Sequence, residues 1–449
     1  MFLYHAQPVN LIKPGLRCGI AYDLLAAVIE TVLNPMSGTP SYPRFASVSV
    51  RQCIRLCRRL LRRARGINER CITLHPTGIP SPRGRVLLSY VIDGVMTRSA
   101  ESLPHSHPHF WETRAMVDVF REEGYVVDVI HWTRRGPLPR TDYDMYVDVR
   151  RNFERYAAAL PARCLKIAHM DTAHHLVHNG NQRTRLEALK ARHGIALEPF
   201  KLVEENRAAE AADLITVLGN NFTINTFAYA GKPIHRVRLS NAFTYAFPET
   251  KNFQAARRRF LWLGSEGFMH KGLDLVLEAF ATMPDHELVV CGPLHSEPAF
   301  TRAFSKQLYH TPNIHAEGWI DVAGDRFRAL TDSSLAVVYP SCSEGGGGCV
   351  ITLMHAGLIP VISREASVDV DPTEGVLLEE SSVDAIRAAV SALSDEAPDR
   401  LRRRARAAWQ RANEHHTRDR FKRDYRAFVK GLPEALDRKR QSLIEQGDS

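Results

Sequence analysis

The stretch from Tyr339 to Ser363, YPSCSEGGGGCVITLMHAGLIPVIS, constrains the fold of this chain more than any other. An apolar, β-rich run that begins at Leu335 leads into it, but the four consecutive glycines Gly345 to Gly348 cannot continue a strand, so a turn is expected there. Apolar residues then recur at helical spacing up to Gly357, a natural helix C-cap, and LIPVI follows as a short buried strand. The sequence therefore predicts strand, glycine turn, helix and strand in succession.

A glycine turn of this kind suits a phosphorylated ligand. Glycines let the backbone approach a ligand closely, and the exposed N–H groups at the start of a helix favour an anion, typically phosphate. Glu344 stands directly before the glycines. A carboxylate is poorly placed to hold phosphate, but it readily accepts hydrogen bonds from sugar hydroxyls. These residue types together point to a nucleotide-sugar site.

The string P-S-x-x-E-G, the glycine-containing turn and a helix that ends A-x-G-x-P-V-I resemble the donor-site signature of one enzyme family. It is glycosyltransferase family 4, the retaining glycosyltransferases of the GT-B fold. The resemblance covers roughly residues 85–431. It is specific in the second half of this range and generic in the first half. In the family a second glutamate, eight positions after the first, binds the ribose, whereas this chain has Thr352 there. A hydroxyl can bridge one ribose oxygen, while a carboxylate can accept from both.

Length and composition describe a folded, water-soluble protein. The 449 residues suffice for two domains plus extensions, and 44% hydrophobic with 24% charged residues is typical of a globular chain. The longest apolar stretch, 24–33, is interrupted by Glu30 and is too short to span a membrane. The N-terminus lacks signal-peptide features, and the eight cysteines form no C-x-x-C pair. We therefore expect a cytoplasmic location and no structural zinc.

Apolar runs alternate with helical segments in two blocks, which predicts the domain plan. Strands are expected in the first block at RVLLSYVI, YVVDVIHW, MYVDV, CLKIAHM and DLITVLG, and in the second at FLWLGS, ELVVCGP and NIHAEGW. Such alternation is typical of parallel sheets covered on both faces, an α/β class. The resemblance implies the GT-B fold, two Rossmann-like doubly wound domains that face a central cleft. The predicted parts are an N-terminal extension 1–83, an acceptor domain 84–240, a donor domain 241–412, and a C-terminal helix 413–449 that crosses back to the first domain.

The resemblance also implies a diphosphate ligand. In the family a lysine before a glycine at this helix start binds the donor diphosphate, and Lys271 with Gly272 matches it. An ammonium group there adds a full charge to the positive end of the helix dipole. The family's arginine, five positions earlier, is replaced by Glu266, so Arg326 and Arg364 are candidate substitutes. If neither arginine substitutes, stabilisation of the leaving group depends on Lys271 and the amides of the glycine turn.

The remaining predicted donor contacts lie on neighbouring loops. By resemblance, Gly318 to Ile320 hold the nucleobase through the main chain, and Trp319 either stacks on the base or belongs to the core. The predicted donor-binding set is Gly264, Ser265, Lys271, Gly318, Trp319, Ile320, Glu344, Gly345, Gly346, Gly347, Gly348, Cys349 and Thr352.

Histidines and a carboxylate mark the acceptor side. His169 and Asp171 follow the strand CLKIAHM, where a histidine in the family faces the donor sugar, so His169 joins Lys271 and Glu344 as a predicted catalytic residue. The predicted acceptor-side set is His105, His107, His109 and Asp171. Zinc is disfavoured because the three alternating histidines have no fourth ligand in sequence. The tandem Rossmann pattern argues against metal at the Asp-x-Asp pairs 142/144 and 369/371, so we expect neither metal nor any other cofactor.

The segment 51–65, RQCIRLCRRLLRRAR, holds seven arginines and no acid beside an apolar stripe. Such a helix either docks on an anionic membrane surface or packs its stripe on the protein, and the sequence leaves both open. A nucleic-acid partner is not expected, because no aromatic residues interleave with the arginines.

The sequence thus predicts an enzyme that moves a sugar from a nucleotide-sugar donor to a saccharide or lipid-linked acceptor. Retention, a role in cell-surface polysaccharide or glycolipid synthesis, and a place in the cytoplasm or on the inner membrane face follow from the resemblance. Two alternatives stay open, a GT-B scaffold that has lost catalysis and serves as a partner subunit, and a GT-B epimerase or phosphorylase. The sugar, base, acceptor, linkage and oligomeric state are not encoded in any spacing rule.

Overall fold

The computed structural model describes residues 66–447 apart from 98, 101 and 106. The basic segment 51–65 lies outside the described residues, as does most of the predicted extension 1–83.

The first domain is built on a seven-stranded sheet in the order β1-β3-β2-β4-β5-β6-β7, parallel except for β1, which pairs antiparallel with β3. Its strands are β1 (Cys71–Leu74), β2 (Gly84–Tyr90), β3 (Tyr125–His131), β4 (Met145–Asp148), β5 (Leu165–Met170), β6 (Leu214–Val217) and β7 (Ile234–Arg236). The five predicted strands are all present. The edge strands β1 and β7 were not predicted, because both are short and neither is buried. Since β1 lies within 1–83, this sheet begins inside the segment predicted to be an extension.

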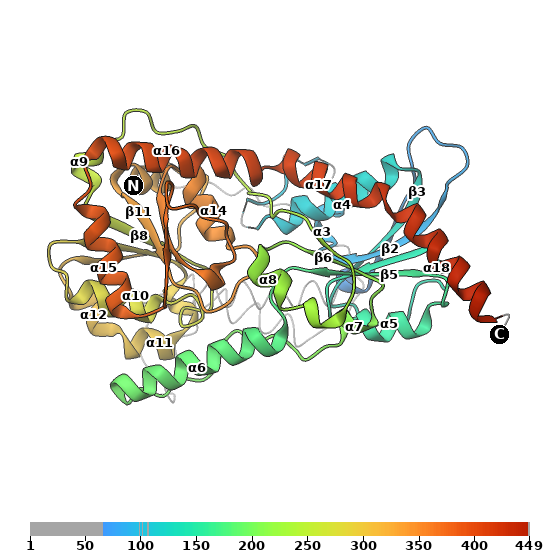
Figure 1. Cartoon of the computed structure of the whole chain (residues 1–449), viewed down its shortest axis with the longest axis horizontal. Coiled ribbons are helices and arrows are strands. Elements are labelled where there is room, and N and C mark those ends of the chain that lie inside the picture. The colour runs from blue at the N-terminus through green and yellow to red at the C-terminus, as the bar shows by residue number, and fades with distance from the viewer. Residues whose placement is uncertain (1–65, 98, 101, 106, 448–449) are drawn as a thin grey trace, which may run out of the picture. The chain divides into compact units, whose positions relative to one another are not determined.

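Helices lie on both sides of this sheet (Figure 1). They are α3 (Asp93–Met96), α4 (His109–Glu122), α5 (Phe153–Ala159), α6 (His175–His193), α7 (Ala208–Ala211) and α8 (Asn221–Asn225), with 3-10 turns η1 (Ile67–Glu69) and η2 (Ala228–Ala230). The helix α4 packs Met116, Val119 and Phe120 into the core, and Gly124, with φ 94°, follows its last turn. The long α6 follows β5, so it begins at the carboxyl edge of the sheet, where ligands bind in doubly wound folds.

The second domain holds a fully parallel six-stranded sheet in the order β10-β9-β8-β11-β12-β13. Its strands are β8 (Arg259–Leu263), β9 (Glu287–Cys291), β10 (Ile314–Gly318), β11 (Ala336–Tyr339), β12 (Ile359–Ser363) and β13 (Val376–Leu378). Its helices are α9 (Phe253–Ala256), α10 (Leu273–Ala281), α11 (Pro298–Ala303), α12 (Ser305–His310), α13 (Asp325–Ser333), α14 (Gly348–His355), α15 (Val383–Ser394) and α16 (Pro398–His415), with η3 (Leu294–Ser296) and η4 (Arg364–Ala366). Strand β11, the glycine turn, α14 and β12 confirm the predicted succession.

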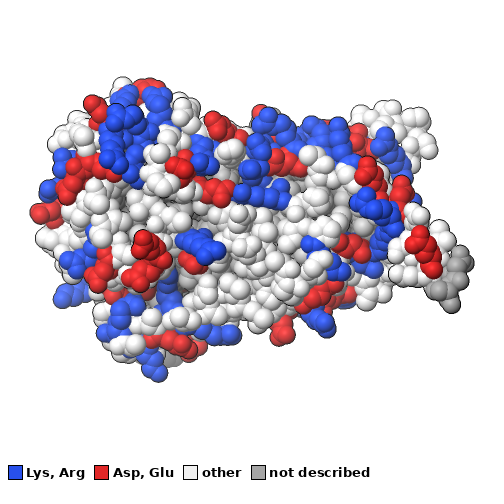
Figure 2. All heavy atoms as spheres, viewed as in Figure 1, with Lys and Arg blue, Asp and Glu red and all other residues white. Residues whose placement is uncertain are grey.

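The C-terminal helices pass from the second domain to the first (Figure 1). In the second domain α16 packs against α14 and β12, whereas α17 (Arg418–Lys430) packs against α4 and α18 (Leu432–Gly447) contacts β5. Lys422 and Arg426 both form ion pairs with Glu122 at the end of α4. Figure 2 shows basic side chains gathered along the edge that α16 and α17 form in Figure 1.

Candidate active site

The two predicted catalytic residues of the second domain stand at the starts of two neighbouring helices. Lys271 precedes α10, separated from it by Gly272, whose φ of 75° is left-handed and favours glycine. A Cβ on Gly272 would also collide with the carbonyl of Pro340. Glu344 lies between β11 and α14. The parallel sheet brings both loops to its carboxyl edge, so the positive ends of two helix dipoles meet there.

Lys271 and Glu344 form a buried ion pair. The Lys271 Nζ donates hydrogen bonds of 2.8 Å to Glu344 Oε1 and of 2.8 Å to the Tyr339 hydroxyl. The Tyr339 and Ser341 hydroxyls donate to the same carboxylate oxygen at 2.9 and 3.2 Å. The two charged side chains are only 4% and 14% exposed. The sequence predicted these residues as separate ligands of diphosphate and sugar, and it missed Tyr339, which joins them.

Both members of this pair are charged at neutral pH. Burial alone would raise the pKa of the Glu344 carboxyl, but the ammonium groups of Lys271 and Lys201 hold it well below its usual range. Burial would lower the pKa of Lys271, yet the Glu344 carboxylate keeps it above the ordinary value. The pair therefore presents fixed charges to a ligand.

Lys201 is a third charged group that sequence analysis missed. It lies between α6 and α7 of the first domain, and its carbonyl accepts a 2.8 Å hydrogen bond from His178 Nε2. Its Cδ is 3.1 Å from the place that a Cβ on Gly267 would take, so the side chain runs along the loop that leads to Lys271. The Lys271 ammonium is the main cause that lowers the pKa of Lys201. No spacing signal relates Lys201 to Lys271, because only the path of α6 brings them together.

The glycine turn is shaped by protein neighbours. Gly346 and Gly347 have φ of 144° and 54°, which favour glycine. A Cβ on Gly345 would collide with the carbonyl of Asp171 in the first domain, and one on Gly347 would collide with Val368. The close approach that the sequence assigned to a ligand is thus made, at these two positions, by the protein itself. After the turn α14 begins at Gly348.

Cys349 and Thr352 lie on the first turns of α14. Burial raises the pKa of the Cys349 thiol, on which the charges of Lys271 and Glu344 also act, so this thiol lies beside the ion pair. The Thr352 hydroxyl is 2.8 Å from Asn241 Oδ1 and 2.9 Å from the Gly348 carbonyl. Thr352 therefore holds the passage between the domains, and its predicted contact with ribose stays a prediction.

The predicted nucleobase loop is open to solvent. Gly318, with φ 84°, accepts a 2.8 Å hydrogen bond from the Gly292 amide at the carboxyl edge of the sheet. Trp319 is 52% exposed, which excludes the alternative that it belongs to the core. Ile320 is half-buried. After β8, Gly264 is buried against Trp262 and Ser265 is exposed.

On the acceptor side, three predicted residues gather around Tyr90. The His169 and His109 rings lie 5.3 and 5.1 Å from the Tyr90 ring. His109 Nε2 is 3.8 Å from Asp171 Oδ2, and Arg150 forms an ion pair with Asp171. Burial opposes ionisation of Asp171, but Arg150 and His109 bring its pKa to about 2. Asp171 is therefore an anion that already has a cationic partner.

His169 is neutral and fully inside the protein. It is 1% exposed, and burial lowers its pKa to about 4. Its Nδ1 lies 2.7 Å from the Thr216 hydroxyl, and its Nε2 has no partner among the described residues. The ring of the exposed His107 lies 4.2 Å from that of His109 and is tilted against it by 51°, whereas His105 Nδ1 lies 3.2 Å from the carbonyl of Ala242. Tyr90, His109, His169 and Asp171 form a group that we call the Tyr90 cluster. The structure brings His107 to this cluster and His105 to the passage between the domains.

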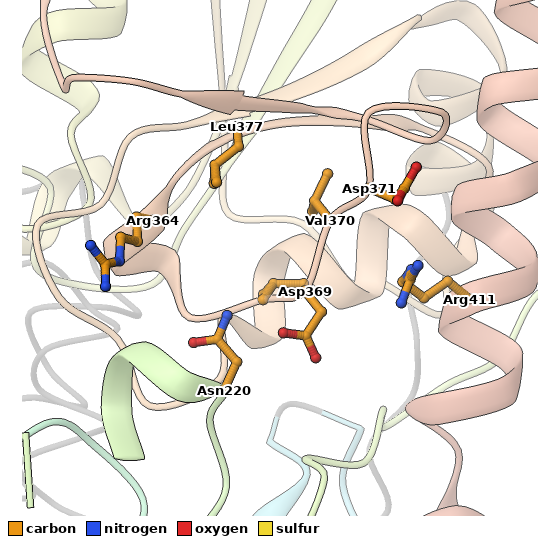
Figure 3. Close-up of a pocket in the computed structure, with 8 residues that line it drawn as sticks. Asn220, Arg364, Asp369, Val370, Asp371, Leu377 and Arg411 are labelled. Carbon is orange, nitrogen blue, oxygen red and sulfur yellow. The ribbon is translucent and has the colours of Figure 1, made fainter. Parts of the chain in front are cut away.

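Within the described part of the chain, no three His, Cys, Asp or Glu side chains are arranged to hold a metal ion. Arg326 is paired with Glu317. Arg364 lines a cavity of about 240 Å³ with Asp369 and Arg411 (Figure 3). No residue of the predicted donor-binding or acceptor-side sets lines this cavity.

Comparisons with known proteins relate the second domain to one enzyme family and the fold to several solved structures. Residues 257–396 match the family model of Glycosyl transferases group 1. No curated protein sequence matches the chain. Among solved structures, sucrose-phosphate synthase from Thermosynechococcus elongatus has a TM-score of 0.52 at 15% identity, with 79% of this chain and 100% of that chain covered. HepE from Anabaena, in complex with UDP-glucose, has a TM-score of 0.51 at 11% identity, covering 78% and 100%. A glycosyltransferase from Rickettsia africae has a TM-score of 0.51 at 10% identity, covering 79% and 97%.

The chain has the GT-B fold, as predicted. The family match covers most of the second domain, including Lys271, Glu344 and the glycine turn. Together, the match and the fold support the predicted glycosyltransferase activity.

Proposed function

We propose that the protein transfers a sugar, with retention, from a nucleotide-sugar donor on the second domain to an acceptor held by the first. The observation that carries this proposal is the buried Lys271–Glu344 pair at the starts of α10 and α14. The three hydrogen bonds found to the Glu344 carboxylate within residues 66–447 all end on Oε1. Oε2 is therefore available to accept from a sugar hydroxyl, while the Lys271 ammonium faces the diphosphate.

The proposed reaction follows from these charges. The bond between the sugar C1 and the departing phosphate oxygen breaks while the acceptor oxygen bonds to C1 on the same face. The departing oxygen takes the acceptor proton. Lys271 and the amides of Gly346 to Gly348 stabilise the charge that grows on the diphosphate. We assign no step to a metal ion, because ammonium groups supply the positive charge here.

The donors to test first carry UDP. HepE, similar in fold to this chain, was crystallised with UDP-glucose. We propose a UDP-sugar donor, a saccharide or lipid-linked acceptor, and a role in cell-surface polysaccharide or glycolipid synthesis. The Tyr90 cluster of the first domain, with neutral His169, is where the acceptor hydroxyl would be oriented.

Calorimetry with UDP, GDP, ADP and their glucose conjugates tests the proposal. We expect at least one nucleoside diphosphate to bind and its sugar conjugate to be turned over only when an acceptor is present. Absence of binding to all of them contradicts the proposed function. Turnover of the donor without an acceptor would indicate an epimerase or phosphorylase instead. Binding without any turnover would indicate a GT-B scaffold that has lost catalysis.

We also propose that the protein works in the cytoplasm, at the inner face of the membrane. The proposal rests on the arginines and apolar stripe of the segment 51–65. None of the helices in the described part of the chain is both long and apolar enough to cross a bilayer. Vesicle flotation tests the docking: binding to anionic vesicles should weaken with salt and be lost on deletion of residues 1–70. Equal binding to neutral vesicles contradicts it.

A further inference from the structure

We propose that Lys201 is a second diphosphate-binding residue of the donor site, supplied across the cleft by the first domain. This inference rests on the proposed function. It extends that function because every residue of the predicted donor-binding set lies in the second domain.

The charge balance of the cluster supports this role. Two ammonium groups, Lys201 and Lys271, act on the carboxylate of Glu344, while the carboxylate of Glu297, on which Lys271 also acts, accepts from the amides of Gly267 and Phe268. Glu344 alone therefore does not balance both ammonium groups, in a region where the Lys271 and Glu344 side chains are almost fully buried. A buried surplus charge is costly unless a counter-ion joins it. A nucleoside diphosphate brings such a charge to the two helix starts that already favour anions.

The backbone around Lys201 is held in place by α6. His178 donates to its carbonyl, and Asn179 exchanges hydrogen bonds of 2.8 and 2.9 Å with the main chain of Val203. Both partners stand on α6, so the segment that carries Lys201 is fastened along this helix. A lysine on such a segment reaches its position without ordering a free loop.

The helix α6 is itself anchored to the loop that carries Glu344. Asn181 donates a 2.8 Å hydrogen bond to the Cys342 carbonyl, and Arg185 donates to the carbonyl of Pro340. The His178 ring also lies 4.4 Å from that of His270, the residue before Lys271. These contacts hold α6, and with it the segment that carries Lys201, beside the loops of Lys271 and Glu344, so the donor site is complete only with α6 in place.

The electrostatic interaction between Lys201 and Lys271 agrees with a role of Lys201 in binding diphosphate. In the free protein the ammonium of Lys271 lowers the pKa of Lys201, since like charges repel. A diphosphate near both lysines would relieve the repulsion and form charge-assisted hydrogen bonds with each of them. Binding of the diphosphate should therefore draw a proton onto Lys201 in alkaline solution, where part of Lys201 is neutral in the free protein.

The test compares nucleoside diphosphate with bare nucleoside in three variants. Lys201→Met removes the charge at nearly constant length, Lys201→Arg keeps it, and Lys190→Met removes an exposed charge elsewhere on α6 as a control. With UDP as probe in calorimetry, Lys201→Met should weaken binding about tenfold or more, the size expected for a charge-assisted contact. Uridine affinity should stay unchanged in every variant, and Lys201→Arg and Lys190→Met should bind UDP within about threefold of wild type.

A measurement on the unmodified protein keeps the inference testable even if Lys201→Met folds poorly. Calorimetry of UDP at several pH values between 8 and 10.5, each in two buffers of different ionisation enthalpy, should show proton uptake that sets in below the ordinary pKa of lysine. UDP affinity unchanged in a folded Lys201→Met protein, an equal loss for uridine, or no proton uptake overturns the role of Lys201 while the proposed function stands. If UDP, GDP and ADP all fail to bind the wild type, the proposed function fails and this inference with it.

Discussion

The donor side and the acceptor side of the cleft differ in how their polar groups are satisfied. On the donor side, Lys271 and Glu344 are fixed ions, and Lys201 is a second ammonium group that acts on the same carboxylate. On the acceptor side, Asp171 is neutralised by Arg150, and His169 is neutral. One side is thus built to receive a charged group, and the other offers neutral groups that can orient a hydroxyl. The comparison predicts that charge changes act mainly on the donor side.

The largest effect is expected from Lys271→Ala. This change removes the cation that faces the leaving group, and kcat/KM should fall about 100- to 1000-fold, since one such contact is worth a few kcal/mol. Steady-state kinetics with Lys190→Ala as the matched control measures the effect. Because the change also leaves the Glu344 carboxylate without its main partner, the thermal midpoint must be recorded in parallel. An unchanged rate in a folded variant would rule out the proposed mechanism.

A smaller effect, on the same side, is expected from Glu344→Gln. The amide can still accept from a sugar hydroxyl but no longer offsets the lysines, so kcat should fall by about 10- to 100-fold. UDP affinity should be unchanged or higher, because the cluster becomes more positive. Calorimetry of UDP beside the kinetics separates the two effects. Loss of UDP binding would instead mean that Glu344 braces the glycine turn through Tyr339 and Ser341.

The two sides also differ in how far the sequence predicted them. Strand, glycine turn, helix and strand in the second domain were predicted because each is encoded within a few residues, as in Gly357 at the end of α14. Lys201 could not be found in this way, since 70 positions separate it from Lys271. The pairing of Asp171 with Arg150 likewise depends on two neighbouring strands of the sheet.

Edge elements were missed for another reason. The strand β1 shows an alternation of exposed and half-buried residues, which lacks the continuous apolar run that marks the central strands. Its place in the sheet follows from antiparallel pairing with β3, a contact across more than fifty residues. Local pattern therefore predicts the buried strands, and long-range pairing decides where the sheet ends.

On the acceptor side we expect a pH effect on stability of about 1 kcal/mol. The pKa of His169 is about 4 in the folded protein and near 6.5 when unfolded, so the unfolded chain binds more protons between these values. Stability should therefore fall as the pH drops from 6.5 towards 4, and at pH 5.5 His169 alone accounts for about 1 kcal/mol of this loss. Urea unfolding at pH 7.5 and 5.5 should show a smaller loss for His169→Gln than for the wild type. Equal losses would mean that His169 is already charged in the fold.

The smallest effect is expected from Thr352→Val, at the boundary between the two sides. Its hydroxyl hydrogen faces Asn241 Oδ1 and the Gly348 carbonyl, but its oxygen can still accept from a ribose hydroxyl. The variant should lose about 1 kcal/mol of stability through Asn241 and bind UDP about threefold more weakly, the size of one neutral hydrogen bond. The preference for UDP over 2′-deoxy-UDP should shrink in the variant, which calorimetry of both nucleotides measures. If that preference is unchanged while stability falls, Thr352 serves only to hold Asn241 between the domains, and the donor site binds ribose without it.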